Sequence, residues 1–130
     1  MNRSICIFSL LTLMLPVCNV YSSPQNMITH NKTSVESNAY IDGTRASPIP
    51  SKAHETSNVP WIIVQLACFG KTINGKCPAL IKMASNTANP IVLGTIELTL
   101  ATGEISPKYL SANGYTLTVN GPGEATLTTN

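Results

Sequence analysis

Side chains that could do acid–base or nucleophilic chemistry are scarce in the second half of the chain. Residues 59–130 contain no histidine, aspartate or arginine. Both histidines, His30 and His54, lie before this region, in a stretch rich in Ser, Thr, Asn and Pro. A hydrolytic triad needs a base that is held rigidly beside its nucleophile, and we expect neither histidine to lie on such an element. The sequence therefore predicts a protein that is not an enzyme.

Metal and cofactor sites are not indicated either. A zinc site needs three or four Cys, His or carboxylate ligands at fixed spacing, and the sequence offers no such group. Phosphate-binding motifs of the GxGxxG or GxxxxGK[ST] type are absent, so we expect no metal and no cofactor. The catalytic alternative is a glycan hydrolase that uses a pair among Glu97, Glu104 and Glu124, whose carboxylates would have to lie about 5–10 Å apart.

The four cysteines divide into two pairs along the chain. Cys6 and Cys18 lie in an apolar leader, whereas Cys68 and Cys77 lie in the region expected to fold. In an oxidising compartment an even pair forms a disulfide by default. The spacing of Cys68 and Cys77 differs from the CxxC of redox and metal sites. We therefore predict a structural Cys68–Cys77 disulfide, which should contribute about 2.5–3 kcal/mol to stability.

The leader has the order of a signal peptide. Arg3 supplies a positive charge, residues 5–17 are mainly apolar, and cleavage is expected near Ser22. The apolar run is shorter than the roughly 20 residues that a membrane span requires. Residues 1–22 therefore predict export, with a secreted or periplasmic product. The alternative is a lipoprotein attached at Cys18, because residues 15–18 resemble the bacterial lipid-attachment box.

Composition limits the size and the partners of the mature protein. At 130 residues the chain allows one domain. The net charge is +2 and only 11% of residues are charged, without the basic cluster that nucleic-acid binding needs. We therefore expect no nucleic-acid partner and no membrane span.

Two regions follow the leader. Residues 23–58 are polar and lack a helical period, which predicts a flexible linker because such a segment buries too little apolar surface to offset its conformational entropy. Residues 59–130 alternate short apolar runs with turn signals, which is typical of an all-β fold. We predict a small antiparallel β-sandwich or partly open barrel of about 5–6 strands. Residues 61–69 are expected to form a central strand, and residues 91–101 the longest strand, with Val92 facing inward.

The last predicted hairpin places several polar side chains on one face. If Leu117 lies opposite Leu127, strand alternation puts four threonines side by side on the exposed face. These are Thr116, Thr118, Thr126 and Thr128. Such an array could bind ice or a crystalline polymer, although threonine is also the ordinary outward residue of a strand.

Aromatic residues offer a second candidate binding surface. Trp61, Tyr109 and Tyr115 could form a patch for a sugar or a peptide, or they could be partly buried with only their polar tips in water. The function predicted from these features is an exported, non-catalytic binding module, effector-like or surface-acting, with an unknown protein or glycan partner. The alternative is a structural subunit that assembles by adding an edge strand to a neighbouring copy.

Overall fold

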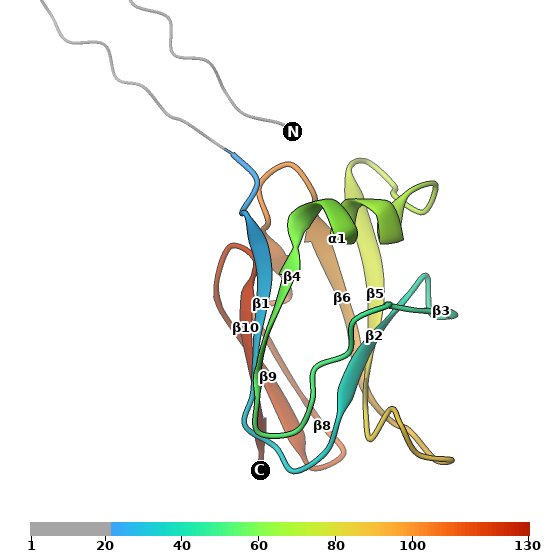
Figure 1. Ribbon diagram of the computed structural model, residues 1–130, viewed down its shortest axis with the longest axis vertical. Helices are drawn as coiled ribbons and strands as arrows, with labels where there is room; N and C mark the ends of the chain where they lie inside the picture. Colours follow the sequence, from blue (N-terminus) through green and yellow to red (C-terminus); the bar gives the residue numbers. More distant parts are fainter. Residues whose placement is uncertain (1–21) are drawn as a thin grey trace, which may run out of the picture.

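The computed structural model describes residues 22–130, which form a β-sandwich of two five-stranded sheets (Figure 1). The first sheet has the order β4-β1-β10-β9-β8, with bounds Thr56–Pro60, Asn26–Asn31, Glu124–Thr129, Tyr115–Gly121 and Tyr109–Ala112. The second has the order β3-β2-β5-β6-β7, with bounds Arg45–Ala46, Ser37–Ile41, Lys76–Met83, Ile91–Thr99 and Ile105–Ser106. The all-β sandwich is thus confirmed, although it has more strands than the sequence predicts. Residues 1–21 of the predicted signal peptide 1–22, and with them the lipoprotein alternative at Cys18, lie outside the described residues.

The prediction of a flexible linker over residues 23–58 is wrong. β1 lies inside the first sheet, where it pairs in parallel with β10 and antiparallel with β4. β2 pairs with β5 in the second sheet. The few polar residues of this segment that are buried make hydrogen bonds: Asn31 and Thr33 are almost fully buried, and the Asn31 side chain donates to the Val35 and Ser51 carbonyls. Composition alone underestimates how ordered such a segment is, because the hydrogen-bond partners of its backbone come from distant strands.

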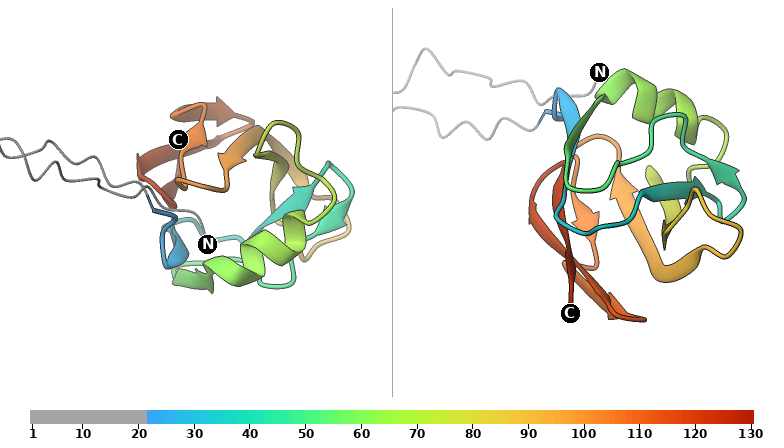
Figure 2. Two further views of the ribbon diagram at one scale, coloured as in Figure 1. Left: turned by 90° about the horizontal axis from the view of Figure 1, so that it is seen from above. Right: turned by 60° about the horizontal axis from the view of Figure 1, so that its bottom comes forward.

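Residues 61–69 are the second correction, because helix α1, Trp61–Cys68, replaces the predicted strand. Trp61, Val64 and Cys68 are buried, which is the spacing of one helix face. A short continuous apolar run does not distinguish a buried strand from a helix by periodicity. The helix closes one end of the sandwich (Figures 1 and 2).

The strand registers agree with the sequence pattern better than the predictions for residues 23–58 and 61–69 do. Leu117 lies opposite Leu127 in the last hairpin, as predicted. In β6 the register shifts at Ile81/Lys82 of its partner strand, and Leu93 rather than Val92 faces the core. A bulge adds one residue to one strand and so reverses the faces beyond it, which is why the prediction for Val92 is wrong.

The core lies between the two sheets and beneath α1. Met83, Ile105 and Leu127 are among the largest fully buried side chains. The predicted disulfide is confirmed: Cys68 at the end of α1 is bonded to Cys77 near the start of β5, and both residues are fully buried. Within residues 22–130 no helix is long and apolar enough to cross a membrane.

Candidate functional site

The outer side of the first sheet carries a row of polar side chains that crosses all five strands. Tyr109 lies opposite Thr118, Thr118 opposite Thr126, and Thr126 opposite His30. His30 in turn lies opposite Thr56 on β4. Directly paired residues share a face of a sheet, and strands lie about 4.8 Å apart, so the row extends over about 19 Å.

A second row beside it completes a continuous polar surface. Thr116 lies opposite Thr128, next to the pair formed by Thr118 and Thr126. We call the two rows together the threonine face, and its members are Tyr109, Thr116, Thr118, Thr126, Thr128, His30 and Thr56. The structure therefore brings the four predicted threonines together on one side of the sheet.

The hydroxyl groups of this face differ in their solvent exposure and in the hydrogen bonds that they already make. The side chain of Thr116 is mostly buried and is hydrogen-bonded to Ser111 and to Asn130. The Thr126 hydroxyl donates to the side-chain Oδ1 of Asn120 at 2.7 Å, whereas Thr118 is exposed to solvent. Thr118 and its neighbours in the first row are therefore the more accessible part of the threonine face.

The three predicted aromatic residues do not form one patch. Trp61 is only 4% exposed, and its indole N–H donates to the Leu100 carbonyl at 3.1 Å. Tyr115 packs against the core on the inner side of the first sheet. Tyr109 is 62% exposed and is the one of the three that lies on the threonine face.

His30 is held between a hydroxyl and a carboxylate, contrary to the sequence prediction. Its Nδ1 lies 3.0 Å from Thr56 Oγ1, and its Nε2 lies 2.7 Å from Glu124 Oε2. An ionised carboxylate only accepts hydrogen bonds, so Nε2 carries the proton. In the neutral ring Nδ1 is then an acceptor for the Thr56 hydroxyl. Neither the position of His30 on a central strand nor its parallel pairing with β10 leaves a local signal in the sequence.

This arrangement can, in chemical terms, orient an imidazole as a base for a hydroxyl. It is not enclosed, because the side chains of His30 and Glu124 are 31% and 40% exposed. A shallow depression beside it is lined by residues 30–32, at the end of β1, and residues 54–56, at the start of β4. The other predicted glutamates lie elsewhere: Glu97 is exposed on the second sheet, and Glu104 pairs with Lys108 at 3.7 Å.

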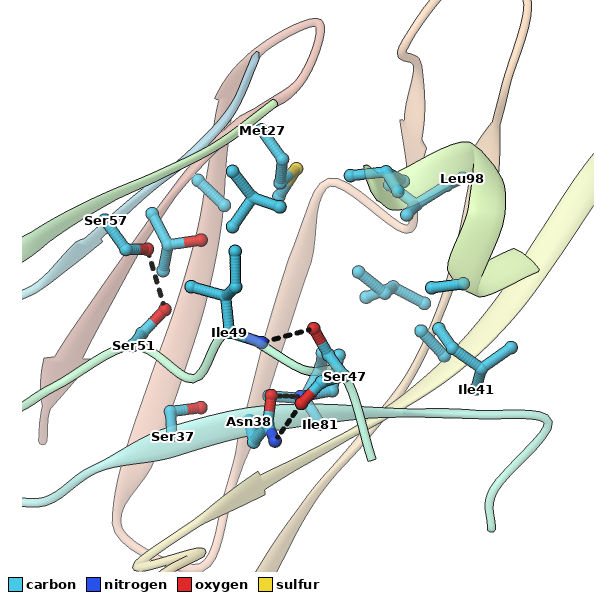
Figure 3. A pocket seen from close by; sticks show the side chains of 18 of the residues that line it. Met27, Ser37, Asn38, Ile41, Ser47, Ile49, Ser51, Ser57, Ile81 and Leu98 are labelled. Carbon is cyan, nitrogen blue, oxygen red and sulfur yellow. Dashed lines mark hydrogen bonds between the residues drawn. The ribbon is translucent and has the colours of Figure 1, made fainter. Parts of the chain in front are cut away.

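A small apolar cavity opens between the two sheets (Figure 3). The segment 47–51, which we call the strap, crosses the gap between β2 and β4 above it, and Ile49 points into the space. Ser51 bonds backbone to backbone with Ser37 at 2.8 Å in both directions, which fixes one end of the strap. The cavity measures about 90 Å³, which is less than the roughly 150 Å³ that accommodates benzene in an engineered protein core.

Metal binding is not supported by the side chains that the structure places together. Among residues 22–130 no three His, Cys, Asp or Glu side chains are arranged to hold an ion.

Comparison with known proteins gives a close match. The family model described as the type II secretion system substrate NttC matches residues 1–130. The crystal structure of the Legionella pneumophila type II secretion system substrate NttC is similar, with 56% sequence identity and a TM-score of 0.82. The similarity covers 83% of this chain and 100% of that chain. No curated protein matches the chain.

Proposed function

The chain belongs to the family of the type II secretion system substrate NttC, and from this premise we propose that it is a secreted, non-catalytic binding protein that uses its threonine face. The fully buried Cys68–Cys77 disulfide supports an oxidising destination. The predicted signal peptide accords with the same route of export. The exported module contacts its partner directly through a folded surface.

The observation that carries the proposal is the row from Tyr109 to Thr56 across five paired strands. Its side chains are mainly uncharged hydroxyls, which donate and accept hydrogen bonds. The imidazole of His30 is already hydrogen-bonded to the neighbouring carboxylate of Glu124 at 2.7 Å. A regular, neutral, hydrogen-bonding face beside one exposed tyrosine ring matches a glycan, which offers hydroxyls and an apolar sugar face for stacking. We therefore assign a glycan as the partner class.

Co-sedimentation with insoluble polysaccharides, cellulose and chitin among them, and a soluble glycan array test this assignment. The double variant Thr118→Val and Thr126→Val removes two hydroxyls with little change in shape. It should weaken binding at least about tenfold, since each lost hydrogen bond contributes about 1 kcal/mol. Thr95→Val on the exposed side of β6 is the matched control and should leave binding unchanged. No binding by the wild-type protein to any glycan, or an equal loss in the control, would refute the assignment.

A hydrolase is the second candidate, because Thr56, His30 and Glu124 form a hydroxyl–imidazole–carboxylate arrangement. In that function His30 Nδ1 would take the hydroxyl proton while Thr56 Oγ1 attacked an ester carbonyl, and the alcohol would leave with that proton as its bond to the carbonyl carbon broke. Water, deprotonated by His30, would then hydrolyse the acyl-threonine and restore the Thr56 hydroxyl. Hydrolysis of p-nitrophenyl acetate that is lost in both Thr56→Val and His30→Gln, but kept in Thr118→Val, would favour this candidate. If the protein only binds its partner, hydrolysis should not exceed that of buffer.

A structural subunit that assembles through sheet edges has weaker support. The edges of the second sheet are β3 and β7, each of two residues, and those of the first sheet are β4 and β8, of five and four residues. Very short edge strands are one means by which proteins prevent strand addition. Light scattering over a range of concentrations should therefore show no growing assemblies.

A further inference from the structure

Helix α1 and the hairpin after it present a row of apolar side chains to solvent. Ile62, Leu66, Phe69 and Ile73 are 59%, 61%, 81% and 71% exposed. We call these four residues the apolar ridge. Ile62 and Leu66 lie one turn apart on the side of α1 opposite its buried residues, and Phe69 caps the C-terminal end of the helix. Single exposed apolar residues are ordinary, but a contiguous group of large ones marks an interaction site.

The ridge is held firmly at one end of the sandwich. The Cys68–Cys77 disulfide fixes the end of α1 to β5. The backbone N–H of Lys71 donates to the Cys68 carbonyl at 2.9 Å, and Ile73 and Lys76 bond one another around the turn. Figures 1 and 2 show α1 lying across one end of the sandwich, at the surface of the molecule.

Positive charge surrounds the ridge. Lys71 and Lys76 flank the turn that carries Ile73, and the Arg45 guanidinium donates to the Ala67 carbonyl of α1. Residues 61–76 contain no acidic residue. Asp42, 3.7 Å from Lys71, is the carboxylate that contacts this group. Three cations and one carboxylate leave the surroundings of the ridge positive.

We infer that the apolar ridge is a membrane-contact surface that inserts into the interface of a bilayer containing anionic lipids. Exposed Phe, Leu and Ile side chains beside basic residues combine the two contributions that hold a protein surface at the interface of an anionic bilayer, which are apolar burial and attraction to anionic lipids. The apolar side chains enter the acyl boundary while the lysine stems extend toward the headgroups. Anionic headgroups complement Arg45, Lys71 and Lys76. This surface is separate from the threonine face, so either assignment can fail without the other.

Vesicle co-sedimentation of the mature chain tests the inference, with phosphatidylcholine vesicles compared to mixed phosphatidylcholine–phosphatidylserine vesicles. The wild-type protein should bind the anionic vesicles more strongly. The double variant Leu66→Ser and Phe69→Ser should lower partitioning at least about tenfold, because two large side chains lose their apolar environment. Lys71→Gln and Lys76→Gln should each lower it about fivefold at low salt. Circular dichroism should show the fold intact, since all four side chains are at the surface.

Val92→Ser is the matched control, because Val92 is an exposed apolar residue of β6 outside the ridge, at 44% exposure. It should leave vesicle binding unchanged. Equal loss in this control, or no vesicle binding by the wild-type protein, would overturn the inference. Concentration-dependent dimers that disappear in Leu66→Ser and Phe69→Ser, without any vesicle binding, would also overturn it and assign the ridge to self-association.

Discussion

His30 Nε2 lies 2.7 Å from Glu124 Oε2 although 94 residues separate them in sequence. The contact exists because β1 and β10 run in parallel, with Ile28 opposite Glu124 and His30 opposite Thr126. Glu124 therefore begins the last strand beside the histidine that the first strand carries. Both side chains remain partly exposed, and this exposure limits how much their pairing stabilises the fold.

The first prediction concerns the energy of this pair. In a double-mutant cycle with His30→Gln and Glu124→Gln, the coupling free energy should be below about 1 kcal/mol, because both side chains are partly exposed and water screens their interaction. Urea denaturation of the four proteins measures it. A coupling above about 2 kcal/mol would show that the pair is shielded from solvent, and would favour the hydrolase candidate.

The second prediction concerns the folding unit. A fragment of residues 59–130 should fail to fold, whereas residues 22–130 should fold. Without the preceding segment the first sheet loses β1 and most of β4, and the second loses β2 and β3. Amide dispersion in a proton–nitrogen NMR spectrum separates the two outcomes. A dispersed spectrum from the short fragment would contradict the assignment of residues 26–60 to the core architecture.

Asn31 gives the third prediction. Its amide donates to the carbonyls of Val35 and Ser51, and its oxygen accepts from the backbone and the hydroxyl of Thr33. Asn31→Ala should destabilise the protein by about 2–3 kcal/mol, because it leaves buried polar groups without partners. Chemical denaturation measures the loss. The exposed Asn120 is the control, and Asn120→Ala should cost less than about 1 kcal/mol; similar losses at both sites would contradict the network.

The fourth prediction compares two glycines in the left-handed region of backbone space. Gly123 has φ +64°, and a Cβ there would lie 2.8 Å from Pro24 and 3.0 Å from the Asn26 carbonyl oxygen. Gly114 has φ +91° with open space around the same position. Both alanine variants incur backbone strain of about 1–2 kcal/mol. Gly123→Ala should be less stable than Gly114→Ala by about 1 kcal/mol more. Thermal unfolding measures this difference. Equal melting temperatures would contradict the close approach of Pro24 and Asn26 to Gly123.

The disulfide gives the fifth prediction. The double variant Cys68→Ala and Cys77→Ala should keep both sheets but lose about 2.5–3 kcal/mol of stability, because the unfolded chain is no longer restrained over this loop. Hydrogen exchange should rise most in α1 and the following hairpin, whose link to β5 is removed. Faster exchange spread evenly over both sheets would show instead that the bond supports the whole fold.

Much of the architecture can be predicted from residues 76–129. The pairing of Leu117 with Leu127 and the placing of Thr116, Thr118, Thr126 and Thr128 on one face follow from strict alternation between two turns. The disulfide follows from an even cysteine pair in an exported chain. These features are local, since a strand alternates its faces every residue and turn residues fix the register.

The secondary structure of residues 23–58 and 61–69 became clear only from the tertiary structure. The strands β1 and β2 are polar, and they are stable because distant strands complete their hydrogen bonds and buried networks such as that of Asn31. The run from Trp61 is apolar on both sides, so periodicity does not separate a covered strand from a helix with one exposed apolar face. The apolar ridge exists only because the chain forms that helix.

The sequence by itself determined the all-β class, the disulfide and the threonine pairs, because each depends on neighbouring residues or on composition. The tertiary structure alone decided that His30 meets Glu124 and Thr56, and that the row of polar side chains crosses five strands. Those contacts depend on which strand lies beside which. Strand order is set by the packing of the complete core, and no local pattern of residues encodes it.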